Sequence, residues 1–241
     1  LTAAYALWTL DIAGEDPGKF GEAFVSYLLK KQAEDGHWGV QTNRPPIEES
    51  KIHTTYLAVT AMIDAAADRK PTEEEEAAVE RAQQWLASSV PKSQEDRVAK
   101  YKALRDIDTD AEATSSERRA IFDQQNEDGG WGQLPDMASD AYATGQTLHA
   151  LVSTERAGKA NATQREAIAR AVSFLLQTQE DDGSWFVKSR SKPIQKMFDN
   201  GDPHGTDQFI SIPATSWATA ALAAAFAEMR AEEEAGEEYD R

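Results

Sequence analysis

One short pattern occurs three times in this chain and constrains the fold more than any other feature of the sequence. A glutamine is followed by a glycine four positions later and by a tryptophan six positions later, and these copies hold half of the chain's six tryptophans. Repetition at a fixed internal spacing indicates stacked supersecondary units that bury their apolar faces against one another. The three copies are Gln32, Gly36 and Trp38; Gln125, Gly129 and Trp131; and Gln179, Gly183 and Trp185.

Each copy ends one amphipathic helix and precedes another. Before the third copy, Ile168, Ala171 and Leu175 recur at helical spacing with polar residues between them. The motif glycine permits the positive φ at which helices commonly stop. We call these preceding helices the outer set, and capping boxes are expected to start three of them, at Thr72–Glu75, Thr114–Glu117 and Thr163–Glu166.

The helices that follow the motifs are richer in alanine and threonine, which allow close packing, and we call them the inner set. Pro213 suits the first turn of the last one. A degenerate copy around Ala82–Leu86 has Val90 in place of the glutamine, which gives four outer and four inner helices. Since strand signals are nearly absent, the class is all-α. The inner helices are expected at residues 3–13, 54–67, 140–155 and 213–229.

Composition narrows the function classes. The formal charge of −17 repels phosphate backbones, so nucleic acid is not an expected partner. The chain has no cysteine, which excludes disulfides and thiolate metal sites. No apolar run reaches the length of a transmembrane segment. We expect residues 1–230 to form the repeat domain, as a fragment of a longer chain, and residues 231–241 to form an acidic tail.

The repeated pattern, following helices with an aromatic–Leu pair, resembles the QW motif of triterpene cyclases such as squalene–hopene cyclase. Related helix pairs build the β subunits of protein prenyltransferases. The resemblance implies an α/α toroid, or an open arc of one, in which the motif glutamine and tryptophan are structural. A closed barrel of this family has more helix pairs, so the remainder of the same polypeptide or a partner would complete it.

The resemblance also directs attention to the start of the third inner helix. The family's cyclases protonate an alkene with an Asp-x-Asp-Asp-Thr-Ala motif, and here Asp140 and Thr144 match while Tyr142 and Ala143 replace the two later aspartates. Asp140 and Tyr142 are therefore the candidate catalytic residues, and the proton-donating motif is incomplete. The prenyltransferase zinc triad needs a cysteine and cannot form.

The connection between Trp185 and Pro213 is unusually long, and such loops are often functional. It carries a basic stretch at Lys188–Lys196, which is either a ligand contact that includes Arg190 or a surface loop beside carboxylates. Later residues, from Phe198 to Ile210, either fold back as a lid or remain on the surface. His204 and Asp207 are candidate ligand-binding residues. Together with Asp202 they either form a zinc site or belong to an ordinary polar turn.

Two further patterns have ordinary explanations. Asp106, Asp108, Asp110, Glu112 and Glu117 are spaced like a calcium loop, but Ala111 stands in place of the turn glycine, which favours a polar connection. His53 and His149 lie on inner helices, where packing is the usual role of a histidine.

Two function classes remain open. In the first, the domain binds an isoprenoid or other apolar ligand through Trp8, Tyr56, Tyr142 and Trp217, with terpene-cyclase-like isomerase or transferase chemistry if it is active. In the second, it is a non-catalytic repeat scaffold for a protein partner, as in divergent bacterial members of the family. Neither class requires a cofactor.

Overall fold

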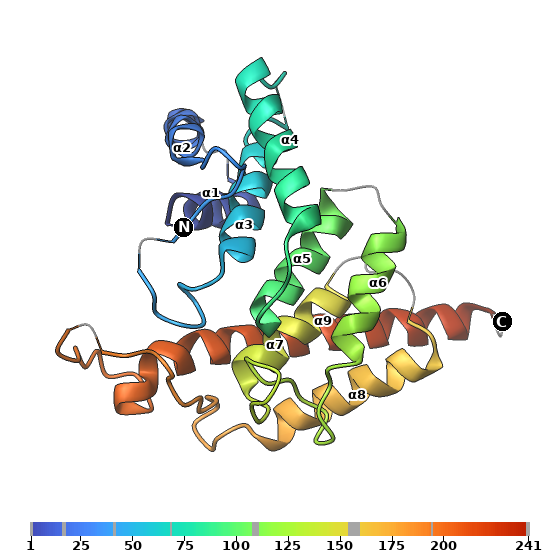
Figure 1. Cartoon of the computed structure of the whole chain (residues 1–241). Helices are drawn as coiled ribbons and strands as arrows, with labels where there is room; N and C mark the ends of the chain where they lie inside the picture. Colours follow the sequence, from blue (N-terminus) through green and yellow to red (C-terminus); the bar gives the residue numbers. More distant parts are fainter. Residues whose placement is uncertain are drawn as a thin grey trace. The chain divides into compact units, whose positions relative to one another are not determined.

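The computed structural model describes residues 2–15, 18–40, 42–67, 69–107, 111–153, 160–193 and 195–239, with Asp11 and residues 231–239 described by their backbone alone. Within these ranges the secondary structure is helical apart from an isolated β-bridge between Arg44 and Glu48 (Figure 1). The predicted all-α class is confirmed.

The chain divides into two compact units, which are described separately. Unit 1 comprises residues 1–92 and 99–114, and unit 2 comprises residues 93–98 and 115–241. Helices α5 (Gln94–Asp106) and α6 (Ala111–Phe122) contribute residues to both. Unit 1 contains α1 (Thr2–Ile12), α2 (Gly18–Lys31), α3 (Lys51–Asp64) and α4 (Glu73–Ser88). Unit 2 contains α7 (Ala141–Val152), α8 (Ala162–Gln177), the 3-10 helix η2 (Gly205–Asp207) and α9 (Gln208–Tyr239).

In each unit the inner helices pack on one another and the outer helices pack against them. In unit 1, α1 contacts α3, and α2 and α4 contact both α3 and each other. In unit 2, α7 lies along α9, and α8 contacts both. Gly145 makes the α7–α9 approach possible, because a Cβ built on it would lie 2.6 Å from the backbone nitrogen of Ala218.

The same joint connects outer to inner helices at all three motifs. Each tryptophan is almost fully buried, and its indole Nε1 donates to the backbone carbonyl ten residues earlier: Leu28 (2.8 Å), Ile121 (2.9 Å) and Leu175 (2.8 Å). Its backbone N–H donates to a threonine hydroxyl of the inner helix: Thr55 (3.0 Å), Thr144 (2.9 Å) and Thr215 (3.1 Å). The motif glycines have φ of +100°, +89° and +85°, which L residues rarely adopt. Three distant segments therefore share one construction.

Several predicted boundaries were wrong. Helix α5 was not predicted, because it is dominated by charged residues and has no motif beside it. The capping box of α4 at Thr72 is confirmed, but α8 is capped by Asn161 with Gln164, and Thr114 lies inside α6. Asparagine is the stronger N-cap, which explains the earlier start of α8.

The inner helices also differ from the predicted ranges. Helix α3 begins three residues before Thr54, at Lys51. Helix α7 ends at Val152, and Glu155, where it was expected to end, lies outside the described residues. Helix α9 begins at Gln208, so Pro213 is inside it rather than in its first turn. The connection predicted to extend to residue 212 therefore stops at η2.

Helix α9 contains a segment that is long and apolar enough to be tested as a membrane span. Within Gly205–Arg230, an 18-residue window has a mean hydropathy of 1.4, and the stretch is long enough to cross a bilayer, whereas no such segment was expected from the sequence. In the structure 39% of this apolar window is buried, and the helix packs along α7. Because a core helix passes the same test of length and composition, this stretch does not establish a membrane span.

Candidate functional site

Asp140, one of the two candidate catalytic residues, caps the first turn of α7. Its Oδ1 accepts from the Ala143 backbone N–H (2.9 Å), and its Oδ2 accepts from Gln133 Nε2 (3.0 Å). The Oε1 of Gln133 in turn accepts from Arg190 Nε (2.8 Å). The structure thus brings two predicted site residues together through Gln133, a buried side chain that the sequence analysis did not identify.

The protonation chemistry of Asp140 does not suit an alkene-protonating acid. Burial raises the pKa of its carboxyl, and the N–H donors of Ala143, Gln133 and Tyr142, together with the charge of Arg190, oppose this rise without cancelling it. A raised pKa makes the group a weaker acid, whereas alkene protonation needs a strong one. The Tyr142 side chain is buried in α7. This arrangement positions the start of α7.

The loop residues Asp207 and His204 have separate partners. Asp207 pairs with Lys188 Nζ (2.9 Å) and accepts from the Ser189 backbone N–H (2.9 Å), and these contacts lower the pKa of its carboxyl against the effect of burial. His204 lies 2.7 Å from the Ser184 hydroxyl. No group of three potential metal ligands converges within the described residues, so the alternative zinc set with Asp202 is not assembled there.

The Ser184–His204 contact was not expected from the sequence. In a Ser-His-Asp catalytic triad, the aspartate hydrogen-bonds to the histidine and orients it, and it does not contact the serine. Here Asp182 Oδ1 is 2.6 Å from the Ser184 hydroxyl and also accepts from the Ser184 backbone N–H (2.9 Å). The aspartate therefore closes the motif turn, as Asp128 does when it accepts from Gly130 N–H (3.0 Å). Asp182 hydrogen-bonds to the serine, where a catalytic triad would need it to hydrogen-bond to the histidine, so the arrangement is a turn and not a triad.

The long connection is anchored at several points in unit 2. The Val187 N–H donates to Ser211 Oγ (3.1 Å), and Gln208 Nε2 donates to the Phe198 carbonyl (2.8 Å). Phe198 itself is 79% exposed, while Ile210 is fully buried in α9. Phe198 therefore does not fill an interior space.

The predicted ligand-binding aromatics have partners within their own units. In unit 1, Trp8 packs edge-on against Tyr5 with ring centroids 6.1 Å apart. In unit 2, Trp217 of α9 packs edge-on against His149 of α7 with centroids 5.4 Å apart. Both contacts link side chains of inner helices and are packing contacts.

Tyr56 belongs to a polar cluster that the sequence analysis missed because it missed α5. Its hydroxyl donates to Asp106 Oδ2 (3.0 Å), and Lys102 Nζ lies 4.8 Å from its ring centroid. Burial and the neighbouring Arg105 guanidinium lower the pKa of Lys102 to about 8. Burial and Asp106 raise the pKa of Tyr56. Tyr56 is thus committed to an internal contact.

The calcium-type spacing falls partly outside the described residues, since Asp108 and Asp110 are not among them. Asp106 pairs with Arg105 (2.6 Å) and Glu117 with Arg97 (3.4 Å). These two acids therefore have cationic partners within the helices.

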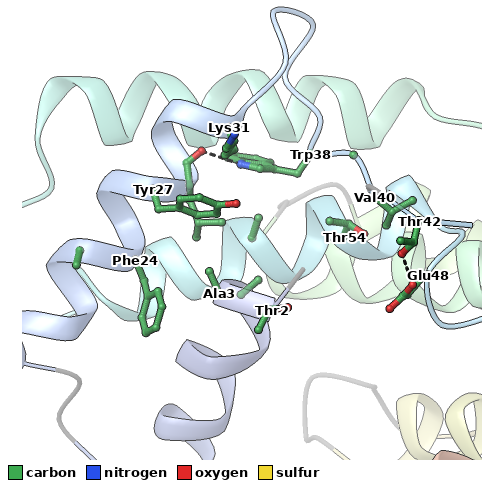
Figure 2. A pocket seen from close by; sticks show the side chains of 15 residues that line it. Thr2, Ala3, Phe24, Tyr27, Lys31, Trp38, Val40, Thr42, Glu48 and Thr54 are labelled. Carbon is green, nitrogen blue, oxygen red and sulfur yellow. Dashed lines mark hydrogen bonds between the residues drawn. The ribbon is translucent and has the colours of Figure 1, made fainter. Parts of the chain in front are cut away.

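Unit 1 contains a cavity of about 770 Å³ between α1, α2, α3 and the segment after Trp38. Figure 2 shows Phe24 and Tyr27 of α2 on one side and Trp38 beside them, with Thr42 and Glu48 at the other end. At that end Arg44 Nε donates to Glu48 (2.6 Å), which lowers the pKa of the Glu48 carboxyl. Most residues of the cavity wall are apolar. Thr42 and Glu48 form a polar end, and Lys31 adds a cationic side chain beside Tyr27 and Trp38. Neither Trp8 nor Tyr56 lines it.

Comparison with known sequences places this geometry in context. Residues 98–193 match the family model described as the squalene-hopene cyclase C-terminal domain. A squalene–hopene cyclase from Zymomonas mobilis is 27% identical over 176 residues, which is 68% of this chain and 19% of that protein. The chain thus spans about a fifth of the length of this curated relative.

Comparison with solved structures gives a more distant likeness. A protein from Salmonella enterica serovar Paratyphi A, described as a possible member of the GH105 family, superposes with a TM-score of 0.55. The match covers 91% of this chain and 68% of that one at 13% sequence identity. At this identity the likeness concerns the fold alone.

Proposed function

Because residues 98–193 match the squalene–hopene cyclase C-terminal domain, we propose that this chain is a squalene-cyclase-type repeat domain that binds an apolar, isoprenoid-like ligand and does not protonate it. The observation that carries the proposal is the cavity of about 770 Å³ in unit 1. Its size falls within the range of small-molecule sites, and its apolar wall with one polar end suits a hydrocarbon chain with a polar head.

The absence of proton transfer is supported by Asp140. Its carboxyl accepts two hydrogen bonds that fix α7, and its pKa is raised by burial. Two of the acidic positions of the family's proton-donating motif are Tyr142 and Ala143. Both features favour binding over cyclisation.

Extraction and mass spectrometry test the proposal. Organic extraction of the purified chain is expected to release an isoprenoid or another apolar compound in about equimolar amount. Ala23→Phe would place a ring in the cavity from an exposed position of α2 and is expected to lower the recovered ligand by about tenfold. Phe20→Ala is the matched control, since Phe20 is on the same helix, 75% exposed and not part of the cavity wall.

Two results would contradict the proposal. If no apolar compound is recovered and added isoprenoid alcohols do not bind, the cavity is not a ligand site. If the chain converts a polyprenyl substrate and Asp140→Asn abolishes the conversion, Asp140 is an acid catalyst and the non-catalytic part is wrong.

A further inference from the structure

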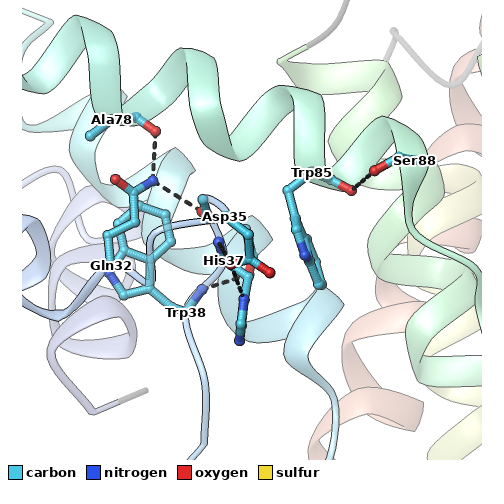
Figure 3. Close-up of polar contacts among 9 residues, drawn as sticks. Gln32, Asp35, His37, Trp38, Ala78, Trp85 and Ser88 are labelled. Atoms are coloured by element: carbon cyan, nitrogen blue, oxygen red, sulfur yellow. Dashed lines mark hydrogen bonds and ion pairs between the residues drawn. The ribbon is translucent and has the colours of Figure 1, made fainter.

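The glutamine of the first motif ties one outer helix to the next. Gln32 Nε2 donates to the Gly36 carbonyl (3.0 Å) and to the Ala78 carbonyl of α4 (2.8 Å), and its Oε1 accepts from Arg81 (2.5 Å). Figure 3 shows the amide of Gln32 directed toward α4, with Ala78 above it. Both N–H groups of the Gln32 amide and its carbonyl oxygen are thus hydrogen-bonded in the joint.

The second motif repeats this joint in unit 2. Gln125 Nε2 donates to the Gly129 carbonyl (2.8 Å) and to the Ala167 carbonyl of α8 (2.8 Å). Its Oε1 accepts from Arg170. The same contacts are made by residues at the same spacing, an alanine and an arginine three positions later.

The motif glycines also fit against these covering helices. A Cβ on Gly36 would lie 2.4 Å from the Arg81 carbonyl oxygen, and a Cβ on Gly129 would lie 2.7 Å from the Arg170 carbonyl oxygen. The covering helix therefore passes directly over the glycine, and both glycines are buried.

The third motif has the same internal geometry without the cover. Gln179 Nε2 donates to the Gly183 carbonyl (2.9 Å), and no second acceptor or arginine contacts its amide within the described part of the chain. A Cβ on Gly183 would meet only Gln179 Nε2, at 3.9 Å. Gln179 and Gly183 are exposed. Leu176 is also exposed (49%), whereas Leu29 and Phe122, which stand at the same position three residues before the motif glutamine, are partly buried.

The sequences of the outer helices show which kind of helix the motif selects. The two covering helices share the pattern Ala-x-x-Arg-Ala-x-x-aromatic-Leu, at Ala78–Leu86 and Ala167–Leu175. Helix α6 follows the degenerate copy that has Val90 for glutamine, and it has Ser116 at the arginine position. The arginine thus occurs where an intact motif precedes it and not where the motif is lost.

We propose that the surface formed by Leu176, Gln179 and Gly183 is a docking site for one further outer-type helix of this polypeptide's own repeat, outside residues 1–241. That helix has a small residue whose carbonyl accepts from Gln179 Nε2 and an arginine three positions later that donates to Gln179 Oε1. A second copy of this chain does not supply it through α2, because Phe20 and Ala23 occupy the corresponding positions there.

An appended helix tests the docking site. The full chain is extended beyond Arg241 by a Gly/Ser linker of about 20 residues, which spans roughly 25 Å, followed by a copy of residues 160–178. Amide hydrogen exchange in the appended segment is expected to be at least about tenfold slower than in the free peptide, because docking protects its backbone. Gln179→Ala, or Ala in place of the appended copy of Arg170, is expected to remove this protection.

Gln177→Ala is the matched control, since Gln177 is exposed on the same helix end and its side chain donates to Ser173 Oγ (2.9 Å) within α8. It is expected to leave the protection intact. Exchange at the rate of the free peptide, or protection that survives Gln179→Ala, would overturn the docking site.

The source of the helix is tested separately. Sedimentation equilibrium of the unextended chain is expected to show no dimer that depends on Gln179. Such a dimer would make a second copy the occupant and overturn the assignment. Within the same polypeptide, the sequence outside residues 1–241 is expected to contain the small-x-x-Arg pattern in a helix. Its absence would contradict the claim that the docking helix belongs to the same polypeptide.

Discussion

The second and third motifs lie in the same unit and differ in one respect. Both bury a tryptophan that donates to the carbonyl ten residues earlier and to a threonine of the inner helix. The second is covered by α8, whereas the third has an exposed glutamine and an open space above its glycine. The tryptophan thus joins helices within a repeat, and the glutamine and glycine join one repeat to the next.

Removing a tryptophan is expected to have the largest effect and to be the same in both motifs. Trp131→Ala and Trp185→Ala should each lower the free energy of unfolding by about 3–5 kcal/mol, because each removes a buried indole. Urea unfolding followed by circular dichroism measures the change. A cost for Trp185→Ala below about 1 kcal/mol would mean that the third joint is not formed, and the comparison would fail.

Substituting the glycines is expected to separate the two motifs. Gly183→Ala should cost about 1 kcal/mol, from its φ of +85° alone. Gly129→Ala should cost about 2 kcal/mol more, since its new methyl group would also press on the Arg170 carbonyl. The same unfolding experiment measures both. Equal costs would show that α8 yields freely and that the close approach is not a constraint.

Acid is expected to weaken the cover of the first motif. The Arg69 guanidinium and the Thr72 backbone N–H lower the pKa of Glu75, in the first turn of α4, to about 2. Because the folded-state pKa is below the unfolded value of 4.5, this stabilisation is present above pH 4.5 and is lost as the pH falls toward 2.

We expect the loss to be about 1–2 kcal/mol, since Arg69 is partly exposed and solvent screens the pair. Unfolding of the wild type and of Glu75→Gln is compared at pH 7 and pH 3. The difference between the two proteins should shrink at pH 3. A difference that stays constant or grows on acidification would contradict the assigned sign.

Features that recur at a fixed spacing could be predicted from the sequence, whereas contacts without a fixed spacing could not. The motif spacing predicted the all-α class and the resemblance to squalene cyclases, and both are confirmed. The hydrogen bonds from the motif tryptophans to Thr55, Thr144 and Thr215 were not predicted, because these threonines lie 17, 13 and 30 residues after their tryptophans and no fixed spacing marks them. Because the connections differ in length, this recurring contact leaves no local sequence pattern.

The candidate site was harder to predict for the same reason. Gln133, which links Asp140 to Arg190, lies in a short connection without a recognisable pattern. Lys102 and Arg105 lie on α5, whose charged composition masks its helical period. Asp140 was identified because it matches the first position of the cyclase family's acidic motif, but its raised pKa depends on burial, which the sequence does not reveal. The catalytic role predicted for Asp140 and Tyr142 stays a prediction.

The motif glutamines provide the most direct test of the account. Gln125 makes a hydrogen bond to α8 and receives one from Arg170, whereas Gln179 makes neither contact, so Gln125→Ala should cost about 1–2 kcal/mol and Gln179→Ala about 0.5 kcal/mol or less. Unfolding free energies of the two variants, measured side by side, give the answer. The account predicts a clearly larger loss at Gln125. Equal losses would contradict the claim that the glutamine joins one repeat to the next.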